Sequence, residues 1–272
     1  MSDESSLAVV IVSYNVRDDL DTCLRSIVGG TEPFPATITI VDNGSADGTV
    51  EMVRERWPAV RVIEAGDNLG FARANNVGIR ATPGDYVLLL NPDTTARPGA
   101  IAALVRELES HAEAAAAGPR LVDQHGTVEL SFGWAIGPLG ELRQKVIGDL
   151  YRRGLPSAVR RVERWTREAG EREWVSGACL LTRRMDLEAV GLLDERYFMY
   201  TEDVDLCVQL RRRGRTIRFV PEAEVVHLRG RSAATNPQTE RMRRQSQLAY
   251  YAKHHPAWVP LLKLYLRVTK KI

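Results

Sequence analysis

The run Leu7-Ala-Val-Val-Ile-Val12, followed at once by Ser13-Tyr14-Asn15, decides the fold class of this chain. A continuous apolar run of this length is typical of a strand covered on both faces, as in a parallel sheet. The polar residues after it mark the carboxyl end of the strand. A helix is expected next, because Leu20, Leu24 and Ile27 fall on one side of a helical turn pattern.

The same alternation continues through the first half of the chain. Further strands are predicted over residues 37–41, 60–63 and 86–90. Further helices are predicted from Asp47 as N-cap, over residues 71–79, and from Pro98 onward. Strands and helices that alternate at this spacing indicate βαβ units. They predict an α/β fold with a mostly parallel central sheet flanked by helices.

The second half is less regular. Residues 131–172 combine glycines with many arginines, and we expect one or two short helices and mobile loops there. A strand is predicted over 174–181, a helix over 202–213 and a strand over 216–220. The tail after Arg229 has a helical pattern and is basic.

The composition is that of a globular protein, with 44% hydrophobic and 26% charged residues among 272. No apolar run approaches the roughly 18–20 residues needed to cross a bilayer. Residues 1–7 are acidic and polar, unlike a secretory signal, so a cytoplasmic protein is expected. The isolated Cys23, Cys179 and Cys207 predict buried thiols, not disulfides or a zinc site.

Polar residues follow four of the predicted strands. They are Ser13-Tyr14-Asn15, Asp42-Asn43, Asp67-Asn68 and Asn91-Pro92-Asp93. Ligands of open α/β sheets bind beyond the carboxyl ends of the strands. The four polar strand ends therefore predict one shared pocket.

Two of these strand ends carry carboxylates. Asp93, in Leu88-Leu-Leu-Asn-Pro-Asp93, can hold a divalent cation that in turn holds a diphosphate, although an Asp here also suits a turn or helix cap. Asp42, in Val41-Asp-Asn-Gly-Ser45, suits a turn as well. Its alternative role is to accept a hydrogen bond from the ring N–H of a pyrimidine.

Further candidates lie in the second half. Glu202 and Asp203 begin a helix, where acidic residues are favoured as caps, but a carboxylate there can also take a proton from an acceptor hydroxyl. Asp203 and Asp205 could instead be solvated. His227 follows a strand and suits either a structural role or a metal site. Arg229 and Arg231 could meet phosphate charge.

Seven segments in order resemble glycosyltransferase family 2, which has the GT-A nucleotide-diphospho-sugar fold. The segments are Val10-Ile-Val-Ser-Tyr-Asn15, Val41-Asp-Asn-Gly-Ser-Ala-Asp-Gly48, Asn68-Leu-Gly-Phe-Ala-Arg-Ala-Asn-Asn76, Leu90-Asn-Pro-Asp93, Gly177-Ala-Cys-Leu-Leu181, Phe198-Met-Tyr-Thr-Glu-Asp-Val-Asp205 and Val226-His227. The resemblance covers about residues 7–232, and within the family the chain looks most like bacterial rhamnosyltransferases.

The resemblance implies a role for each matching position. Asp203 is the implied general base, and Asp93 with His227 the implied ligands of Mg²⁺ or Mn²⁺. The implied donor-binding residues are Ser13, Tyr14, Asn15, Asp42, Asn68, Arg73, Asn75, Asn91 and Asp93. The implied acceptor-binding residues are Trp174, Gly177 and Glu202. One position departs from the family pattern: Asn91 replaces the first acid of the DxD motif, which makes the metal site less negative.

The resemblance also implies an activity and a domain plan. A GT-A catalytic domain is expected over 1–232, with a nucleotide-binding half (1–120) and an acceptor-binding half (121–232), followed by a helical extension over 233–272. The implied reaction is inverting transfer from a nucleotide sugar, dTDP-rhamnose first, to a glycan or lipid-linked acceptor in cell-surface polysaccharide assembly. The alternatives are a UDP-hexose-dependent transferase of the same fold and a non-catalytic nucleotide-sugar- or carbohydrate-binding module. A nucleic-acid partner is not expected, because no such module is recognisable.

The basic tail allows two interpretations. Its cations, among them Lys263, Arg267, Lys270 and Lys271, are interleaved with Leu, Tyr and Trp. Such a stretch can lie on an anionic membrane, which would place the protein at the inner face of the cell membrane. It can equally form a helical hairpin packed against the catalytic domain.

Overall fold

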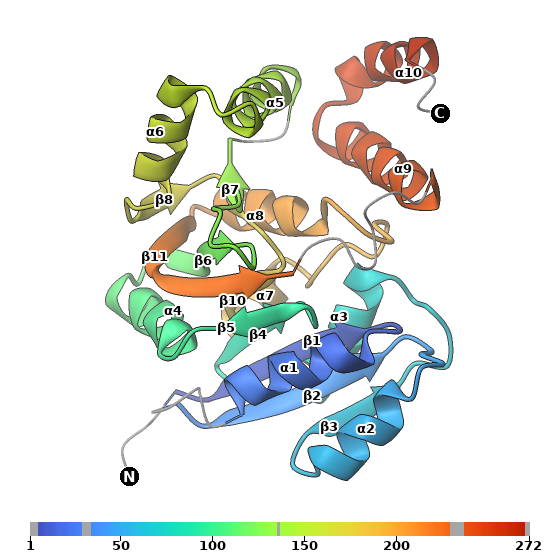
Figure 1. Ribbon diagram of the computed structural model, residues 1–272. Coiled ribbons are helices and arrows are strands. Elements are labelled where there is room, and N and C mark those ends of the chain that lie inside the picture. The colour runs from blue at the N-terminus through green and yellow to red at the C-terminus, as the bar shows by residue number, and fades with distance from the viewer. Residues whose placement is uncertain (1–4, 29–33, 135–136, 229–236, 270–272) are drawn as a thin grey trace.

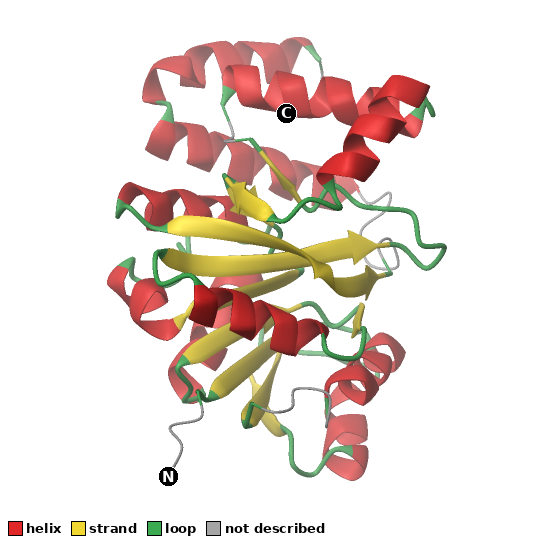
Figure 2. Cartoon of the chain, turned by 90° about the vertical axis from the view of Figure 1, so that its left-hand side faces the viewer, coloured by secondary structure: helices red, strands yellow, loops and turns green. Residues whose placement is uncertain are grey.

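The computed structural model describes residues 5–28, 34–134, 137–228 and 237–269. Arg229, Arg231, Lys270 and Lys271, for which phosphate or membrane contacts were predicted, lie outside these ranges. A sheet forms the centre of the molecule, and helices cover both of its faces (Figures 1 and 2).

Among the described residues, nine strands form the central sheet, in the order β3-β2-β1-β4-β10-β6-β11-β5, with β8 pairing to β11. Their bounds are β1 (Leu7–Ser13), β2 (Ala36–Asp42), β3 (Arg61–Glu64), β4 (Tyr86–Leu90), β5 (Thr94–Ala96), β6 (Ala114–Val122), β8 (Gly170–Arg172), β10 (Cys179–Arg183) and β11 (Thr216–His227). Strands β3, β2, β1 and β4 are mutually parallel, so their carboxyl ends meet at one edge. Strand β10 runs antiparallel between β4 and β6. The expected α/β class is confirmed.

The helices of the body flank this sheet. They are α1 (Arg17–Ile27), α2 (Thr49–Arg56), α3 (Phe71–Ala81), α4 (Ala100–Ser110), α7 (Arg184–Ala189) and α8 (Glu202–Arg212). Residues of β1 alternate between two apolar cores: Val9 packs with the core that holds α1, and Val10 packs with the core that holds α3. This two-sided burial is the reason that the sequence of β1 is apolar at every position.

A further layer of helices lies above the sheet in Figure 1. It contains α5 (Pro138–Arg152), α6 (Pro156–Trp165), α9 (Pro237–His254), the short 3₁₀ helix η1 (Pro256–Trp258) and α10 (Val259–Val268). A third apolar cluster includes Tyr197, Tyr250 and Leu266, and it joins α9 and α10 to the body of the protein. One face of the tail therefore packs as a hairpin on the body. In the part of the chain that is described, no helix is both long and apolar enough to cross a membrane.

Two element boundaries differ from the sequence prediction. The predicted strand over 174–181 is wrong as a single strand: β9 (Trp174–Val175) pairs with β7 (Phe132–Gly133), and β10 begins only at Cys179. The strand is interrupted between them, where the Gly177 N–H donates to the Asp203 side chain and not to a neighbouring strand. Asp47 is not the N-cap of α2. Gly48 is, with φ of 80°, while the Asp47 carboxylate accepts the Thr49 N–H.

Other differences concern length. Helix α4 begins at Ala100 and not at Pro98, because Gly99 adopts φ of 80°. The middle of the chain holds two helices, and α5 spans 15 residues instead of the short helix expected there. Strand β11 spans 12 residues and continues past Pro221 through an irregularity between Val220 and Glu224. Proline lacks the N–H that a regular ladder needs. The three cysteines are buried and free, as predicted.

Candidate active site

The end of β2 is organised around Asp42, which is 2% exposed. Its Oδ1 accepts hydrogen bonds from the hydroxyls of Ser13 (3.0 Å) and Ser45 (2.5 Å). Its Oδ2 accepts the backbone N–H of Gly44 (3.1 Å) and of Ser45 (2.8 Å). Four donors thus hold the carboxylate in the turn. A pyrimidine N–H would have to replace one of the two hydroxyls, both of which can rotate.

The end of β1 is tied to the same turn. Asn15 lies in the left-handed region with φ of 53°, its N–H donates to Ser45 Oγ (2.9 Å), and its Oδ1 accepts the Ala46 N–H (2.8 Å). Tyr14, which precedes Asn15 in the chain, is exposed. The ends of β1 and β2 therefore form one fixed wall, from which the ring of Tyr14 projects into solvent.

The segment before α3 meets the loop that leads to α8. Asn68 Oδ1 accepts the Gly70 N–H at 3.0 Å, and the Phe71 N–H donates to the Phe198 carbonyl at 2.6 Å. Gly70 has φ of 79°, and a Cβ there would overlap the Phe198 carbonyl oxygen. Arg73 is exposed. The Asn75 side chain is buried and donates to the Phe71 carbonyl (2.9 Å).

His227 lies between two carboxylates. Pairing of β5 with β11 places His227 opposite Thr94, next to Asp93. His227 Nε2 is 3.4 Å from Asp93 Oδ1, and Nδ1 is 3.2 Å from Glu129 Oε2. Burial lowers the pKa of His227, but the hydrogen bonds and charges of Asp93 and Glu129 outweigh it and raise this pKa to about 9. Glu129 was not found from the sequence, because nothing in its local pattern links it to a residue 98 positions away.

Asp93 and His227 fit a divalent cation shared with a diphosphate. A carboxylate oxygen is a ligand that Mn²⁺ and Mg²⁺ prefer, and such ions commonly take one or two protein ligands together with substrate phosphates. The His227 nitrogen would bind the ion only after releasing the proton that its raised pKa favours. Within the described ranges no group of three His, Cys, Asp or Glu residues could hold a metal ion alone. The remaining ligands would therefore come from the donor and water.

Asp203 stands at the start of α8. Its Oδ2 accepts the Gly177 N–H and its Oδ1 accepts the Val204 N–H, both at 2.8 Å. Burial raises the pKa of Asp203 above its usual value, and the hydrogen bonds offset only part of that effect. Burial and the neighbouring Asp203 raise the pKa of Glu202 well above the normal range for Glu. Glu202 Oε2 is buried and has no hydrogen-bond partner among the described residues.

A short backbone path joins the Asp93 turn to Asp203. The Asn91 N–H donates to the Ala178 carbonyl at 2.9 Å, and the next residue back, Gly177, donates to Asp203 at 2.8 Å. The segment Gly177–Ala178, between β9 and β10, therefore contacts Asp203 on one side and Asn91, two residues before Asp93, on the other. Strand β9, which carries Trp174, packs against α8, and the Trp174 ring N–H donates to the Trp134 carbonyl at 2.9 Å.

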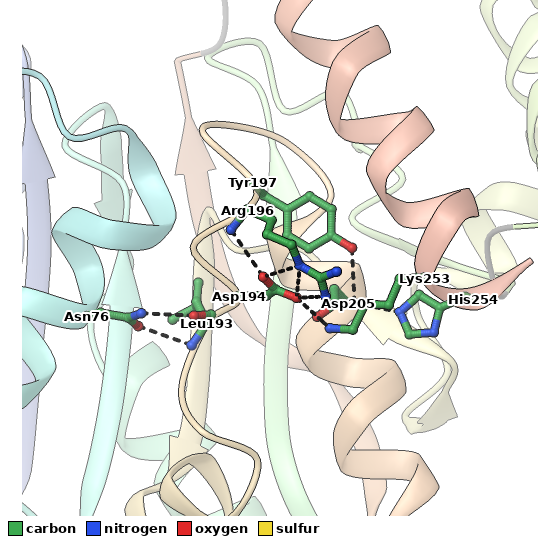
Figure 3. A network of polar contacts seen from close by, with 8 residues as sticks. All are labelled: Asn76, Leu193, Asp194, Arg196, Tyr197, Asp205, Lys253 and His254. Atoms are coloured by element: carbon green, nitrogen blue, oxygen red, sulfur yellow. Dashed lines mark hydrogen bonds and ion pairs between the residues drawn. The ribbon is translucent and has the colours of Figure 1, made fainter. Parts of the chain in front are cut away.

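Asp205 is buried, contrary to the expectation that it could be solvated. Its carboxylate lies 2.7 Å from Lys253 Nζ and 2.5 Å from His254 Nε2, and it accepts the Tyr197 hydroxyl at 3.2 Å (Figure 3). Lys253 also reaches Asp194 at 2.7 Å. The third acid of the Glu-Asp-Val-Asp segment thus anchors the C-terminal helix α9 to α8 and is not part of the open site.

One large surface hollow lies elsewhere. It has a volume of about 510 Å³ and is lined by residues such as Asp85, Arg183 and Arg184, at the opposite end of β4 from Asp93. None of the candidate site residues lines it.

This fold, with a carboxylate beyond β4 and a second one at the start of α8, defines a glycosyltransferase of the GT-A type. The chain belongs to the family described as Glycosyl transferase family 2, whose sequence profile matches residues 8–191.

Similar proteins agree with this assignment. The chain is 35% identical over 266 residues to the N-acetylglucosaminyl-diphospho-decaprenol L-rhamnosyltransferase of Mycobacterium tuberculosis, covering 93% of this chain and 86% of that protein. It is 22% identical to rhamnosyltransferase WbbL of Escherichia coli K12, covering 80% and 82%. Its fold is similar to that of the mannosyltransferase PcManGT of Pyrobaculum calidifontis, solved with GDP-Man and Mn²⁺, with a TM-score of 0.65, 18% identity and coverage of 96% and 69%.

Proposed function

We propose that this enzyme transfers L-rhamnose from dTDP-rhamnose, with inversion, to a hydroxyl of a lipid-linked glycan in cell-surface polysaccharide assembly. The observation that carries the proposal is the Asp203 carboxylate, held by the Gly177 amide beside the turn that bears Asp93. The donor and acceptor classes are supported by the similarity to the mycobacterial rhamnosyltransferase, whose name specifies a decaprenol-linked substrate.

Asp203 is suited to remove a proton from the acceptor hydroxyl. A carboxylate that is largely shielded from water, as the half-buried Asp203 is, is a stronger base than a solvated one, because the shielding disfavours its charged form and raises its pKa. The two backbone N–H groups keep one orientation of the carboxylate without transferring a proton themselves. The oxygen freed of its proton then attacks the anomeric carbon on the face opposite the leaving nucleotide diphosphate, which inverts that carbon.

Glu202 is suited to bind the acceptor in its neutral form. Burial and the neighbouring Asp203 raise the pKa of Glu202, which favours the protonated carboxyl, and a protonated carboxyl can donate a hydrogen bond. The buried Oε2 lacks a partner among the described residues, and a buried polar atom of this kind is costly unless something satisfies it. An acceptor hydroxyl next to Asp203 would supply that partner.

The donor binds, in this proposal, along the ends of β1, β2 and β4. Asp42 with its serine partners faces the pyrimidine, Tyr14 lies beside the base, and Asn68, Arg73, Asn75 and Asn91 belong to the surrounding wall. Asp93 and His227 would hold a divalent cation, which offsets charge on the departing diphosphate when it is bound. The two protein ligands of this ion would be Asp93 Oδ1 and His227 Nε2, which lie 3.4 Å apart.

The test is a donor panel with the purified protein. Binding and slow donor hydrolysis are measured for dTDP-rhamnose, UDP-glucose, UDP-galactose and GDP-mannose, each with and without Mn²⁺. We expect binding and hydrolysis with dTDP-rhamnose in the presence of Mn²⁺, and an inverted product by NMR when acceptor is added. Turnover of a UDP-hexose alone would reassign the donor, and binding of every donor without hydrolysis or transfer would indicate a non-catalytic module.

A further inference from the structure

Helix α10 exposes an apolar stripe. Leu261, Leu264, Tyr265 and Val268 are between 46% and 74% exposed. Their spacing of three, four and seven residues places them on one side of the helix. On the other side, Leu262 and Leu266 are buried in the cluster that joins the tail to the body. One face of α10 is therefore covered by the protein, and on the other face Leu261, Leu264 and Val268 are apolar and exposed.

Helix α5 repeats this arrangement. Leu139, Leu142 and Val146 follow helical spacing and are 83%, 59% and 46% exposed. The helix is fixed from another side, where the Glu141 carboxylate accepts the Gln247 side-chain N–H of α9 at 2.7 Å. Helices α5 and α10 lie at the same end of the molecule, at the top of Figure 1. We call the two exposed stripes, together with the exposed cations Arg143 and Lys145 of α5 and Lys263 and Arg267 of α10, the apical surface.

The apical surface carries excess positive charge. From His255 to Thr269 the chain has no Asp or Glu, and Lys263 and Arg267 are exposed on α10. Around α5 and α6, residues 137–169 hold eight basic residues against four acidic ones, and of those four Glu141 faces α9. The basic residues are Arg143, Lys145, Arg152, Arg153, Arg160, Arg161, Arg164 and Arg167.

We propose that the apical surface docks on the surface of an anionic phospholipid bilayer. Apolar side chains on one helical face enter the boundary between headgroups and acyl chains, and neighbouring cations meet the anionic headgroups. A second copy of the chain fits less well, because it would bring two basic surfaces together. A nucleic acid would neutralise the cations but leave the leucines in water.

The apical surface is fixed relative to Asp203. Lys253 and His254 of α9 bind the buried Asp205, two residues after Asp203 (Figure 3). Ser246 Oγ donates to the Met199 carbonyl, in the loop that leads to α8, at 2.7 Å. Docking would therefore orient Asp203 with respect to the bilayer. The inference rests on the proposed function in one respect only, namely that a lipid-linked acceptor lies in the same bilayer.

The experiment is flotation with vesicles of phosphatidylglycerol and phosphatidylcholine, compared with vesicles of phosphatidylcholine alone. The wild type should bind the anionic vesicles, and binding should weaken at high salt. Leu261→Glu with Leu264→Glu, and separately Lys263→Glu with Arg267→Glu, should each weaken binding about tenfold or more. The matched control is Met185→Glu, which changes an apolar residue of α7 that is 72% exposed and belongs to neither stripe.

The outcomes separate the alternatives. The proposal is overturned if the wild type does not bind anionic vesicles at low salt. It is equally overturned if both double variants bind these vesicles as strongly as the wild type. It is also overturned if the wild type is a dimer in solution that Leu261→Glu with Leu264→Glu dissociates, because the surface then joins two copies. Circular dichroism verifies that the variants fold. Donor hydrolysis without vesicles tests the proposed function separately: hydrolysis without vesicle binding removes only the docking proposal.

Discussion

The backbone N–H of Gly177 donates a hydrogen bond to Oδ2 of Asp203 across 2.8 Å. Gly177 lies between β9 and β10, which belong to different sheets, so its N–H takes part in neither strand ladder. A fixed donor on one oxygen holds the carboxylate in place. The absence of a side chain at Gly177 also matters, since a Cβ there would lie 3.1 Å from the Cβ of Asp203.

We therefore predict that Gly177→Ala slows transfer while leaving donor binding intact. The added methyl group displaces the carboxylate by a few tenths of an ångström, and small displacements of a catalytic group are costly, here about tenfold in kcat. Steady-state kinetics should show a lower kcat with an unchanged KM for the donor. Gly148→Ala is the control, because a Cβ at Gly148 meets only the end of the Arg152 side chain, at 3.6 Å. Equal kcat values for the two variants would contradict the assigned role.

The raised pKa of Asp203 predicts a pH dependence. The carboxylate is the active form, so kcat should fall as the pH decreases through a pKa above the usual 3.8 of Asp. Glu202→Gln is the control: the proton is assigned to Asp203 and not to Glu202, so this change should leave the acid limb in place. An acid limb at or below 3.8, measured from kcat against pH, would refute the assignment.

The same pKa shift predicts a change in stability. Folding disfavours the charged form of Asp203, so its ionisation destabilises the folded state as the pH rises through the raised pKa. Asp203→Asn cannot ionise, so its unfolding free energy should not decline over this pH range as that of the wild type does, even though its single side-chain oxygen keeps only one of the two N–H bonds. Urea unfolding of both proteins at several pH values, monitored by fluorescence, measures this. The same pH dependence in both proteins would contradict the raised pKa of Asp203.

Glu129 should matter for metal binding, although it is not expected to be a ligand. Its carboxylate contacts Nδ1 of His227, which leaves Nε2 directed at Asp93. Partners of metal-binding histidines are typically worth about 10–100-fold in affinity. Glu129→Ala should weaken Mn²⁺ binding by this amount, measured by electron paramagnetic resonance in the presence of dTDP. The exposed Glu163 provides the control, Glu163→Ala. Unchanged Mn²⁺ affinity in Glu129→Ala would exclude this role.

The ion network at Asp205 should stabilise the whole chain. Asp205→Asn removes a buried charge that contacts both Lys253 and His254, and breaking a buried pair of this kind costs about 3 kcal/mol. Chemical unfolding should show this loss. Asp149→Asn, which affects the more exposed pair with Arg152, should change stability little. If the two variants have the same free energy of unfolding, α9 is not anchored through Asp205.

Much of the fold could be predicted from local patterns. The apolar run of β1 and the alternation of strands and helices indicated the sheet correctly, because buried parallel strands need uninterrupted apolar sequence. The break at Gly177 could not be predicted, since residues 174–181 read as one strand and only the partner Asp203, 26 positions away, explains the break. The extension of β11 past Pro221 was missed for a similar reason, as proline normally ends a ladder.

The candidate site was predictable only in part. The positions of Asp93, Asp203 and His227 follow from strand and helix ends, which a sequence marks clearly. The contacts of Glu129, of Asp205 and of the four donors to Asp42 depend on which segments meet in space. Donor and acceptor roles for individual residues stay predictions until they are measured.

The central claim is that Asp203 acts as the base on a donor held beside Asp93. Asp203→Asn tests it most directly, with transfer and dTDP-rhamnose binding measured on the same preparation. Transfer should fall by about 10²–10⁴-fold, the usual contribution of a general base, while the dissociation constant of the donor stays within about twofold. Near-normal transfer by Asp203→Asn would contradict the account.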